Sequence, residues 1–463
     1  MPQTHCFTRR QFGWLLSSAA LSFGRAAERG PWAEPALVKK IYLAVPQPTW
    51  PRPDLNVPAE MAAIEGKIAE LERKHPGAVR FAAPQLVRTP EEAEACVKGL
   101  GDVDAVLLID LTSGTSGMLR PLRDLPVPVL LFARPYSGWS YVDVAAWVQS
   151  GKRADLLSTS EFGDLDPYMR IFYTIHHLRH SKVLAVVQNP SQGDSVAAAF
   201  TKQYGTAIRF LGYGDLQQAY QAADPARARQ AAEEFTRGAL RVVEPSQQDI
   251  LAALRFHLGV QDLLRREQAN AITVDCLGGF RRGELPAYPC VSWSKLNDAG
   301  LYGVCEADLR STMTQLLLTA FSGKPGFVSD PVFDTSRNEI IHAHCVSATA
   351  LQGVGGPSSP YIIRSHMEDN KGVSMQVLAP VAETVTCGKF LSAGKFAVSL
   401  GEVVGNVDAP HGCRTKFRTR VADARKMLEN FSGGLHRVVV YGDYLRPVEQ
   451  MGRLMGFQVM REC

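Results

Sequence analysis

Short apolar runs alternate with helical segments through residues 38–300, and this alternation limits the fold more than any other feature of the sequence. The runs predict strands at residues 38–45, 79–81, 105–110, 128–133, 182–188, 208–211 and 271–275. The segments between them carry helical periodicity and start signals, as in Thr89-Pro90-Glu91-Glu92. Apolar strands separated by helices are typical of parallel sheets covered by helices on both faces. The sequence therefore predicts two α/β units in succession.

The pattern changes after residue 325. Strand-like runs punctuated by glycine dominate up to residue 421, which predicts an antiparallel β domain, and helix and strand alternate again over residues 423–460. A chain of 463 residues is too long for one ordinary core. We expect an α/β protein with parallel-sheet units at 38–152 and 153–325, followed by an antiparallel β-rich domain at 326–463.

Several classes of function lack their sequence signals. No GxGxxG motif opens a helix after the first strand and no GxxxxGK[ST] motif is present, so we expect no nucleotide cofactor. The net charge is +4, with Lys and Arg scattered along the chain, so we expect no nucleic-acid partner. No stretch after residue 30 is apolar for long enough to span a bilayer.

The first 27 residues resemble a twin-arginine export signal. The segment Thr8-Arg9-Arg10-Gln11-Phe12 precedes a modest apolar stretch at 13–23, and small residues follow at 24–27. This predicts handling by the twin-arginine export machinery and a periplasmic or extracellular location. The alternative is an ordinary amphipathic helix, in which case the protein stays in the cytoplasm. The nine cysteines include no CxxC pair, and buried free thiols are the simplest interpretation.

Acidic residues and histidines gather between residues 305 and 344. Glu306 and Asp308 open an apolar helical run, Asp330 follows a short strand, and His342 and His344 have the two-residue period of a strand. Carboxylates and an imidazole at the ends of regular elements suit a hard divalent cation. Each also has a structural interpretation, since acids complement the first turn of a helix and Asp330 precedes a proline, as turn residues often do.

Motifs along the second half of the chain resemble one enzyme family. They are Cys305-Glu306-Ala307-Asp308-Leu309, Gly323-Lys324-Pro325 with Asp330 after it, His344-Cys345, and the run from Leu435 to Tyr444, LHRVVVYGDY. Together and in this order they resemble the L-fucose isomerase and L-arabinose isomerase family, particularly its fucose-isomerase-like branch. The predicted order of two α/β units and a β-rich domain agrees with that family.

The resemblance implies a divalent metal, usually Mn²⁺, held by Glu306, Asp330 and His436, with His344 as a fourth ligand as in the arabinose-type members. It implies that Glu306 and Asp330 are also catalytic, moving a proton between C1 and C2 of an open-chain sugar through a cis-enediol. Under this assignment Asp308 and His342 have structural roles.

Four further residues are candidates for contact with the sugar. Ser292, Trp293 and Asn297 lie just ahead of Glu306 and offer hydroxyl, aromatic and amide groups. Trp139 follows the C-terminal end of a predicted strand, where ligand loops of α/β sheets lie. In the family a neighbouring subunit completes the site, which implies a homo-oligomer, a trimer or hexamer, with Trp139 acting on the neighbour.

Two departures from the family leave other functions open. The isomerases of sugar catabolism work in the cytoplasm, whereas this chain carries an export signal. The charged run Glu368-Asp369-Asn370-Lys371 also stands in a stretch that the family keeps richer in glycine. The alternatives are an exported sugar-binding or sensing protein without turnover, and a different metal-assisted reaction of a sugar, such as epimerisation or elimination.

Overall fold

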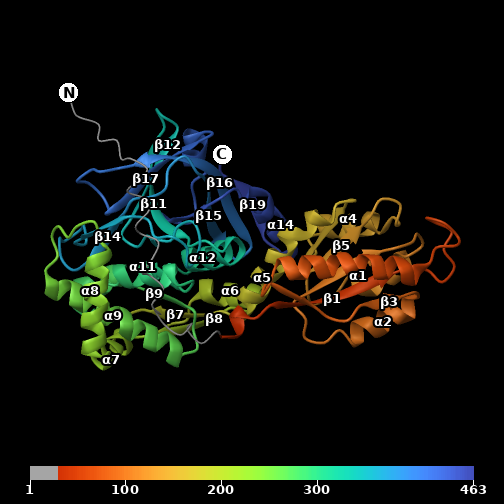
Figure 1. The fold of residues 1–463 in the computed structure, drawn as a ribbon, viewed down its shortest axis with the longest axis horizontal. Helices are drawn as coiled ribbons and strands as arrows, with labels where there is room; N and C mark the ends of the chain where they lie inside the picture. Colours follow the sequence, from red (N-terminus) through yellow and green to blue (C-terminus); the bar gives the residue numbers. More distant parts are fainter. Residues whose placement is uncertain (1–29) are drawn as a thin grey trace, which may run out of the picture.

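The computed structural model describes residues 30–463, and the predicted export signal at 1–27 lies outside this range. The molecule is elongated (Figure 1). An N-terminal α/β unit forms one end, and a second α/β unit with a β-barrel against it forms the other. The predicted fold class is confirmed: two parallel-sheet units precede an antiparallel, β-rich C-terminal domain.

The first sheet has the order β2-β1-β4-β5-β6, and all of its pairings are parallel. Its strands are β1 (Ala36–Leu43), β2 (Val79–Phe81), β3 (Gln85–Val87), β4 (Ala105–Asp110), β5 (Val129–Ala133) and β6 (Ala154–Ser158), with β3 also pairing with β1. The connecting helices are α1 (Val57–Lys74), α2 (Pro90–Lys98), α3 (Ser116–Leu122) and α4 (Ser140–Gln149). Because β6 pairs with β5, this sheet extends past residue 152, where the sequence predicts the end of the unit.

The second sheet, β10-β9-β7-β8, is also parallel throughout. Its strands are β7 (Lys182–Val186), β8 (Ala207–Leu211), β9 (Ala271–Val274) and β10 (Tyr302–Cys305). The helices of this unit are α5 (Asp166–His180), α6 (Ser195–Tyr204), α7 (Tyr213–Ala222), α8 (Pro225–Gly238), α9 (Gln247–Arg266), α10 (Cys276–Arg282) and α11 (Cys290–Asp298). Two short 3₁₀ turns, η1 (Pro31–Ala33) and η2 (Phe162–Leu165), precede β1 and α5.

Six strands of the C-terminal domain close into an antiparallel barrel in the order β15-β18-β11-β12-β17-β16, with β16 pairing back onto β15. They are β11 (Phe327–Asp334), β12 (Glu339–His344), β15 (Thr384–Ser392), β16 (Lys395–Asn406), β17 (Thr415–Val421) and β18 (Arg437–Tyr441). The remaining elements are the hairpin β13 (Tyr361–Arg364) with β14 (Ser374–Val377), the helices α13 (Ala424–Glu429) and α14 (Leu445–Met455), and β19 (Gln458–Arg461), which adds to β16 in parallel.

Helix α12 (Leu309–Ser322) connects the second sheet to the barrel and is buried along almost its whole length. It contacts α5 on one side and strands β15 and β18 of the barrel on the other. A helix that is apolar around most of its circumference requires such cover. The residues at its two ends, Glu306 before it and Asp330 after it, are therefore held by a rigid core.

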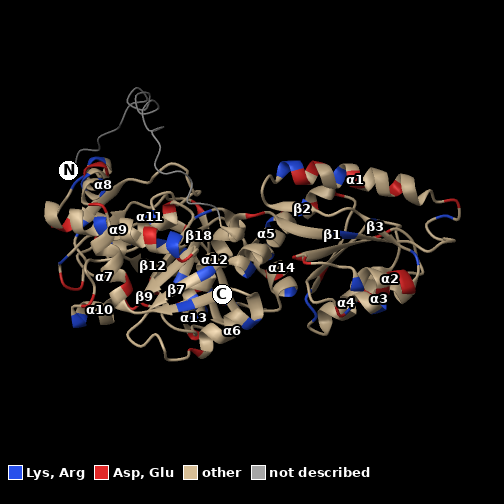
Figure 2. Cartoon of the chain, turned by 90° about the horizontal axis from the view of Figure 1, so that it is seen from below, with Lys and Arg blue, Asp and Glu red and all other residues tan. Residues whose placement is uncertain are grey.

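Charged residues of both signs lie interspersed on the surface, as along α1 (Figure 2). Among residues 30–463, no helix combines the length and the apolar character that a bilayer span needs.

Candidate metal centre

Glu306 lies at the carboxyl end of the second sheet, directly after β10. Glu306 and Ala307 both have left-handed backbone conformations, with φ of 65° and 52°. The N–H of Ala307 still donates to the carbonyl of Val274 in β9 (2.9 Å), so the sheet holds the bend in place. Two successive non-glycine residues with positive φ are uncommon, and such strain gathers at functional sites. The bend directs the chain from β10 into α12 with Glu306 at the turn.

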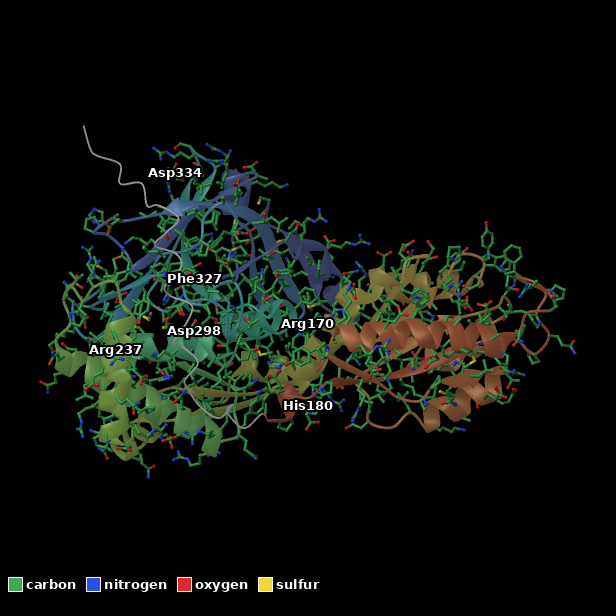
Figure 3. All side chains as sticks on the ribbon, in the orientation of Figure 1. Arg170, His180, Arg237, Asp298, Phe327 and Asp334 are labelled. Carbon is green, nitrogen blue, oxygen red and sulfur yellow. The ribbon has the colours of Figure 1, made fainter. Side chains whose placement is uncertain are left out.

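The barrel register brings the other residues beside it. Asp330 of β11 pairs with the residue before His344 in β12. On the other edge of β11, Ser329 pairs with Arg437 of β18, which places Asp330 opposite His436. Figure 3 labels both ends of β11, with the first residue inside the molecule and the last at the outer tip of the barrel. Asp330 lies midway along the strand.

Four side chains from these elements converge. Nε2 of His436 lies 3.5 Å from Oε2 of Glu306 and 3.4 Å from Oδ1 of Asp330. Nε2 of His344 lies 4.0 Å from Oε1 of Glu306. The imidazoles are about 5% exposed, whereas the carboxylates of Glu306 and Asp330 are 35% and 26% exposed. The group is therefore buried on its histidine side and open on its carboxylate side.

Three atoms of this group are buried and have no hydrogen-bond partner in the described structure: Asp330 Oδ1, His344 Nε2 and His436 Nε2. Buried polar atoms are seldom left without partners. Two carboxylates and an imidazole that meet in this way fit a hard divalent cation such as Mn²⁺. Glu306, Asp330 and His436 are the residues that would hold it.

Asp308 orients His436. Its Oδ2 accepts hydrogen bonds from Nδ1 of His436 (2.9 Å) and from Nζ of Lys389 (2.6 Å). It also caps α12 by accepting from the N–H of Ser311 (3.0 Å). Because Nδ1 of His436 is bonded to Asp308, Nε2 is the ring atom that faces the carboxylates, as is usual for a histidine that binds a metal. The sequence predicts only that the charge of Asp308 complements the first turn of the helix.

The charges shift one another's protonation. His436 lowers the pKa of Glu306, whereas burial and then the nearby Glu306 carboxylate raise the pKa of Asp330 to about 6. Burial opposes ionisation of His436, but its hydrogen bond to Asp308 and the nearby Glu306 carboxylate raise its pKa to about 9. Although burial also opposes ionisation of Asp308, His436 and Lys389 hold its pKa far below the usual range. The cluster carries more negative than positive side chains near its open side, which favours a cation.

The neutral ring of His344 carries its proton on Nε2 and can donate a hydrogen bond from that atom. The backbone N–H of Cys345 donates to its Nδ1 (2.9 Å), and burial lowers its pKa to about 3, so the ring is neutral. The ring proton therefore lies on Nε2, the atom that points toward Glu306. The resemblance implies that His344 is a fourth ligand, and the ligand atoms of Glu306, His344 and His436 all lie within 4.8 Å of one another. In this arrangement, Nε2 of His344 presents a proton to the cluster. His342 is a buried barrel residue bonded to the hydroxyls of Ser329 and Thr419.

The structure places three of the predicted sugar-binding residues in the core beneath β10. Ser292 and Trp293 are fully buried on α11, where Ser292 bonds to His257. Asn297 accepts from the N–H of Gly303 (3.0 Å) and donates to its carbonyl (3.3 Å). These contacts hold the strand that carries Glu306, and none of them reaches the cluster. Both faces of α11 are covered, so its polar side chains serve the packing around it.

Trp139 lies in the N-terminal unit, just before α4 and apart from the barrel (Figure 1). It is 48% exposed and stacks on Trp50 with ring centroids 5.2 Å apart, next to Tyr136, which is 74% exposed. Within one chain it does not join the cluster.

Comparisons with known proteins do not assign the chain to a family. No protein-family model matches it, and no curated protein matches it.

Proposed function

We propose that the protein is a divalent-metal-dependent isomerase that interconverts an aldose and a ketose, acting on a small neutral sugar similar to fucose or arabinose. The convergence of Glu306, Asp330 and His436 carries the proposal, because the unpartnered atoms of Asp330 and His436 lie beside the Glu306 carboxylate and both carboxylates face the open side. The resemblance of the motifs around these residues to the fucose and arabinose isomerases supports it.

Glu306, Asp330 and His436 would hold Mn²⁺ or a similar ion. When bound, such an ion polarises a carbonyl oxygen and makes the neighbouring C–H more acidic. The other steps belong to the side chains. One of the two carboxylates takes the proton from C2 of the open-chain aldose, and a proton returns at C1. The hydroxyl proton of O2 passes to O1 in the same conversion, and the two carboxylates can carry both protons, so no additional base is needed.

The neighbouring residues position these groups. Asp308 holds the ring of His436 in one orientation, and Lys389, only 1% exposed, balances the charge of Asp308. Nε2–H of His344 is placed to donate to a sugar hydroxyl or to Glu306. The proposal includes export through the twin-arginine route and a homo-oligomer in which Trp139 of one subunit reaches the sugar of its neighbour.

Proton exchange with solvent tests the reaction. Purified protein with Mn²⁺ is incubated in D₂O with a panel of aldoses, and NMR follows deuterium entering C2. We expect exchange with at least one pentose or 6-deoxyhexose, its loss in chelator, and a decrease of about 100-fold or more in Glu306→Gln and Asp330→Asn. Asp334→Asn, at the outer end of the same strand as Asp330, is the matched control and should retain exchange.

Wild-type exchange in Glu306→Gln or Asp330→Asn, with the variants folded, would refute the assigned roles. Tight sugar binding in calorimetry without exchange on any sugar would instead support the sugar-binding protein.

A further inference from the structure

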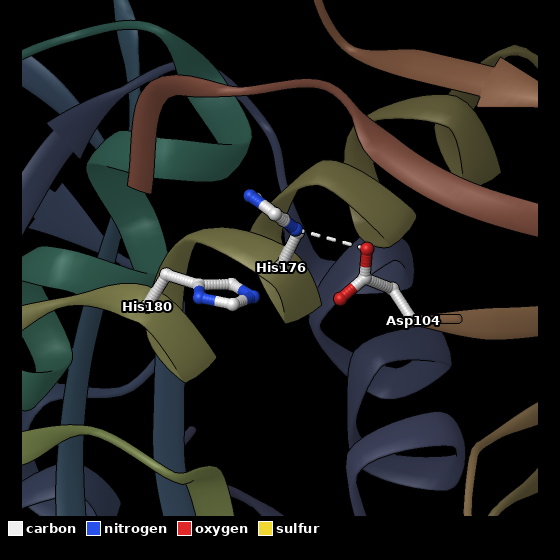
Figure 4. A group of neighbouring side chains, drawn as sticks. All are labelled: Asp104, His176 and His180. Carbon is white, nitrogen blue, oxygen red and sulfur yellow. Dashed lines mark hydrogen bonds and ion pairs between the residues drawn. The ribbon is translucent and has the colours of Figure 1, made fainter. Parts of the chain in front are cut away.

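A second group of metal-binding side chains lies where the N-terminal unit meets the rest of the molecule. Asp104 stands just before β4, and His176 and His180 lie one turn apart on α5 (Figure 4). Residues four positions apart project from the same face of a helix. The ligand atoms of the three side chains all lie within 4.8 Å of one another. Figure 3 shows His180 at the junction of the two parts, well apart from the barrel tip.

The surrounding bonds prepare His176 and Asp104 for a cation. Nε2 of His176 donates to the carbonyl of Pro31 (2.9 Å), which leaves Nδ1 of a neutral ring with its lone pair toward Asp104. Nδ1 lies 2.9 Å from Oδ2 of Asp104, and this oxygen also accepts from the N–H of Leu37 (2.9 Å). A metal-binding histidine typically donates its other ring N–H to a carbonyl or carboxylate. Pro31 fills that role here.

Asp104 and His180 each have a group that is free to bind a cation. Oδ1 of Asp104 is buried and has no hydrogen-bond partner in the described structure. The carboxylate is only 5% exposed, so water cannot readily take the place of that partner. The ring of His180 lies against that of His176, with centroids 4.3 Å apart and the ring planes tilted by 35°. It makes no hydrogen bond in the part of the chain that the structure describes. His180 is partly exposed, so an ion can enter from its side.

We propose that Asp104, His176 and His180 form a zinc site that is separate from the Glu306 cluster. Two imidazoles and one carboxylate suit Zn²⁺, which is commonly bound by three protein ligands and a water molecule. The ion replaces the proton that His176 and Asp104 share in its absence. This donor set is richer in nitrogen than that of the Glu306 cluster, so the two sites differ in the metal they favour.

One positive charge opposes the ion. Nη1 of Arg179 lies 3.5 Å from Oδ1 of Asp104, but its Nη2 is 2.6 Å from Asp102, at a distance typical of a strong charge-assisted bond. Arg179 therefore keeps a carboxylate partner when Asp104 turns to the metal.

The site joins three segments that are distant in sequence. His176 and the adjacent His177 donate to the carbonyls of Pro31 and Trp32 in η1, so α5 already grips the segment that leads into β1. Asp104 adds the entrance of β4. A bound ion at this point fixes the N-terminal unit on α5. This holding of the N-terminal unit does not depend on the proposed sugar reaction.

Cobalt spectroscopy tests the site in the full chain. Glu306→Gln and Asp330→Asn are combined to silence the other cluster, the protein is freed of metal, and Co²⁺ is added as the probe. We expect one equivalent to give the intense visible bands of a four-coordinate ion, and Zn²⁺ to displace them. His180→Ala, which removes a partly exposed ring, should weaken Zn²⁺ binding by about 100-fold or more. His75→Ala, a histidine of the same unit paired with Asp166, is the matched control.

Two further measurements test the proposed zinc site. His180→Ala in the otherwise unchanged chain should keep its sugar exchange activity with Mn²⁺ but lose the rise in thermal unfolding midpoint that Zn²⁺ produces. Absence of Co²⁺ bands in the silenced protein, or equal Zn²⁺ affinity in His180→Ala and His75→Ala, would refute the site and reduce the group to an ion pair. Neither result bears on the isomerase, whose failure appears in the exchange assay alone.

Discussion

The pair of Asp308 and Lys389 offers a sharp test of how the metal centre is supported. Lys389 is 1% exposed and its ammonium group bonds to Asp308 and to the hydroxyl of Ser311. Asp308→Asn removes the counter-charge but retains an oxygen that can cap α12, because Asn and Asp are equally good N-caps. The substitution therefore isolates the loss of charge beside a buried lysine.

Removing one partner of a buried ion pair costs about 3–5 kcal/mol of unfolding free energy. Since Asp308 is 21% exposed and Asn keeps one acceptor, the lower end applies. For a cooperative unit of 150–250 residues, about 3 kcal/mol lowers the thermal unfolding midpoint by roughly 6–12 °C. The orientation of His436 also weakens, so the Mn²⁺ concentration needed for activity should rise by about 10–100-fold.

Thermal unfolding is followed by circular dichroism in chelator, so that metal binding does not contribute. Lys389→Met and the double variant complete a mutant cycle, and we expect a coupling of about 1–3 kcal/mol because the double variant leaves no unpaired charge. The exposed Asp334→Asn should remain within about 0.5 kcal/mol of wild type. Strictly additive effects of Asp308→Asn and Lys389→Met, or an unchanged Mn²⁺ requirement, would refute the supporting role of the pair.

Three other predictions follow from single residues. His344→Ala should retain about one Mn²⁺ per chain with reduced turnover whereas His436→Ala should lose the ion, and metal analysis showing equal loss would contradict the donor tautomer of His344. Ala307→Gly should relieve a left-handed alanine that costs about 1 kcal/mol and raise the unfolding midpoint by roughly 2–4 °C with activity intact, as calorimetry and the exchange assay can check. Burial lowers the pKa of His257 to about 3. As pH falls below about 6.5, the unfolded chain binds a proton at this residue and the folded chain does not, so the free energy of unfolding decreases by about 1.4 kcal/mol per pH unit. This slope of stability with pH in chelator should be shallower in His257→Asn, and an equal slope would show that another group causes the loss.

The sequence predicts those elements whose periodicity is strong. Residues 195–204 form a helix as expected, and strands β7, β8 and β9 follow the predicted apolar runs, whereas β10 (Tyr302–Cys305) is absent from the prediction. Strand β17 (Thr415–Val421) is absent from the prediction because its Lys, Arg and Thr residues give no apolar run, although most of the strand is buried in the barrel. Helix α7 (Tyr213–Ala222) is absent too, since it is polar overall and begins with Tyr-Gly. Barrel closure through β15 and β16 depends on pairings that no local pattern contains.

For the candidate metal centre, too, the sequence indicates some features and only the fold gives the others. The residue types and the family resemblance indicate Glu306, Asp330 and His436, but not that they lie close together. A helix of 14 residues separates Glu306 from Asp330, and His436 comes to lie beside Asp330 only through the register between β11 and β18. The sequence nevertheless contains a signal for the ion pair of Lys389. Lys389 stands between Gly388 and Phe390 in a strand with no other charged residue, and a lysine buried there needs an anion within reach. The acidic pair at the head of α12 is the nearest supply of such anions in the fold, and only one of the two, Asp308, also accepts from His436. The buried Lys389 therefore predicts a nearby carboxylate. Which carboxylate it is, Asp308, follows only from the closed barrel.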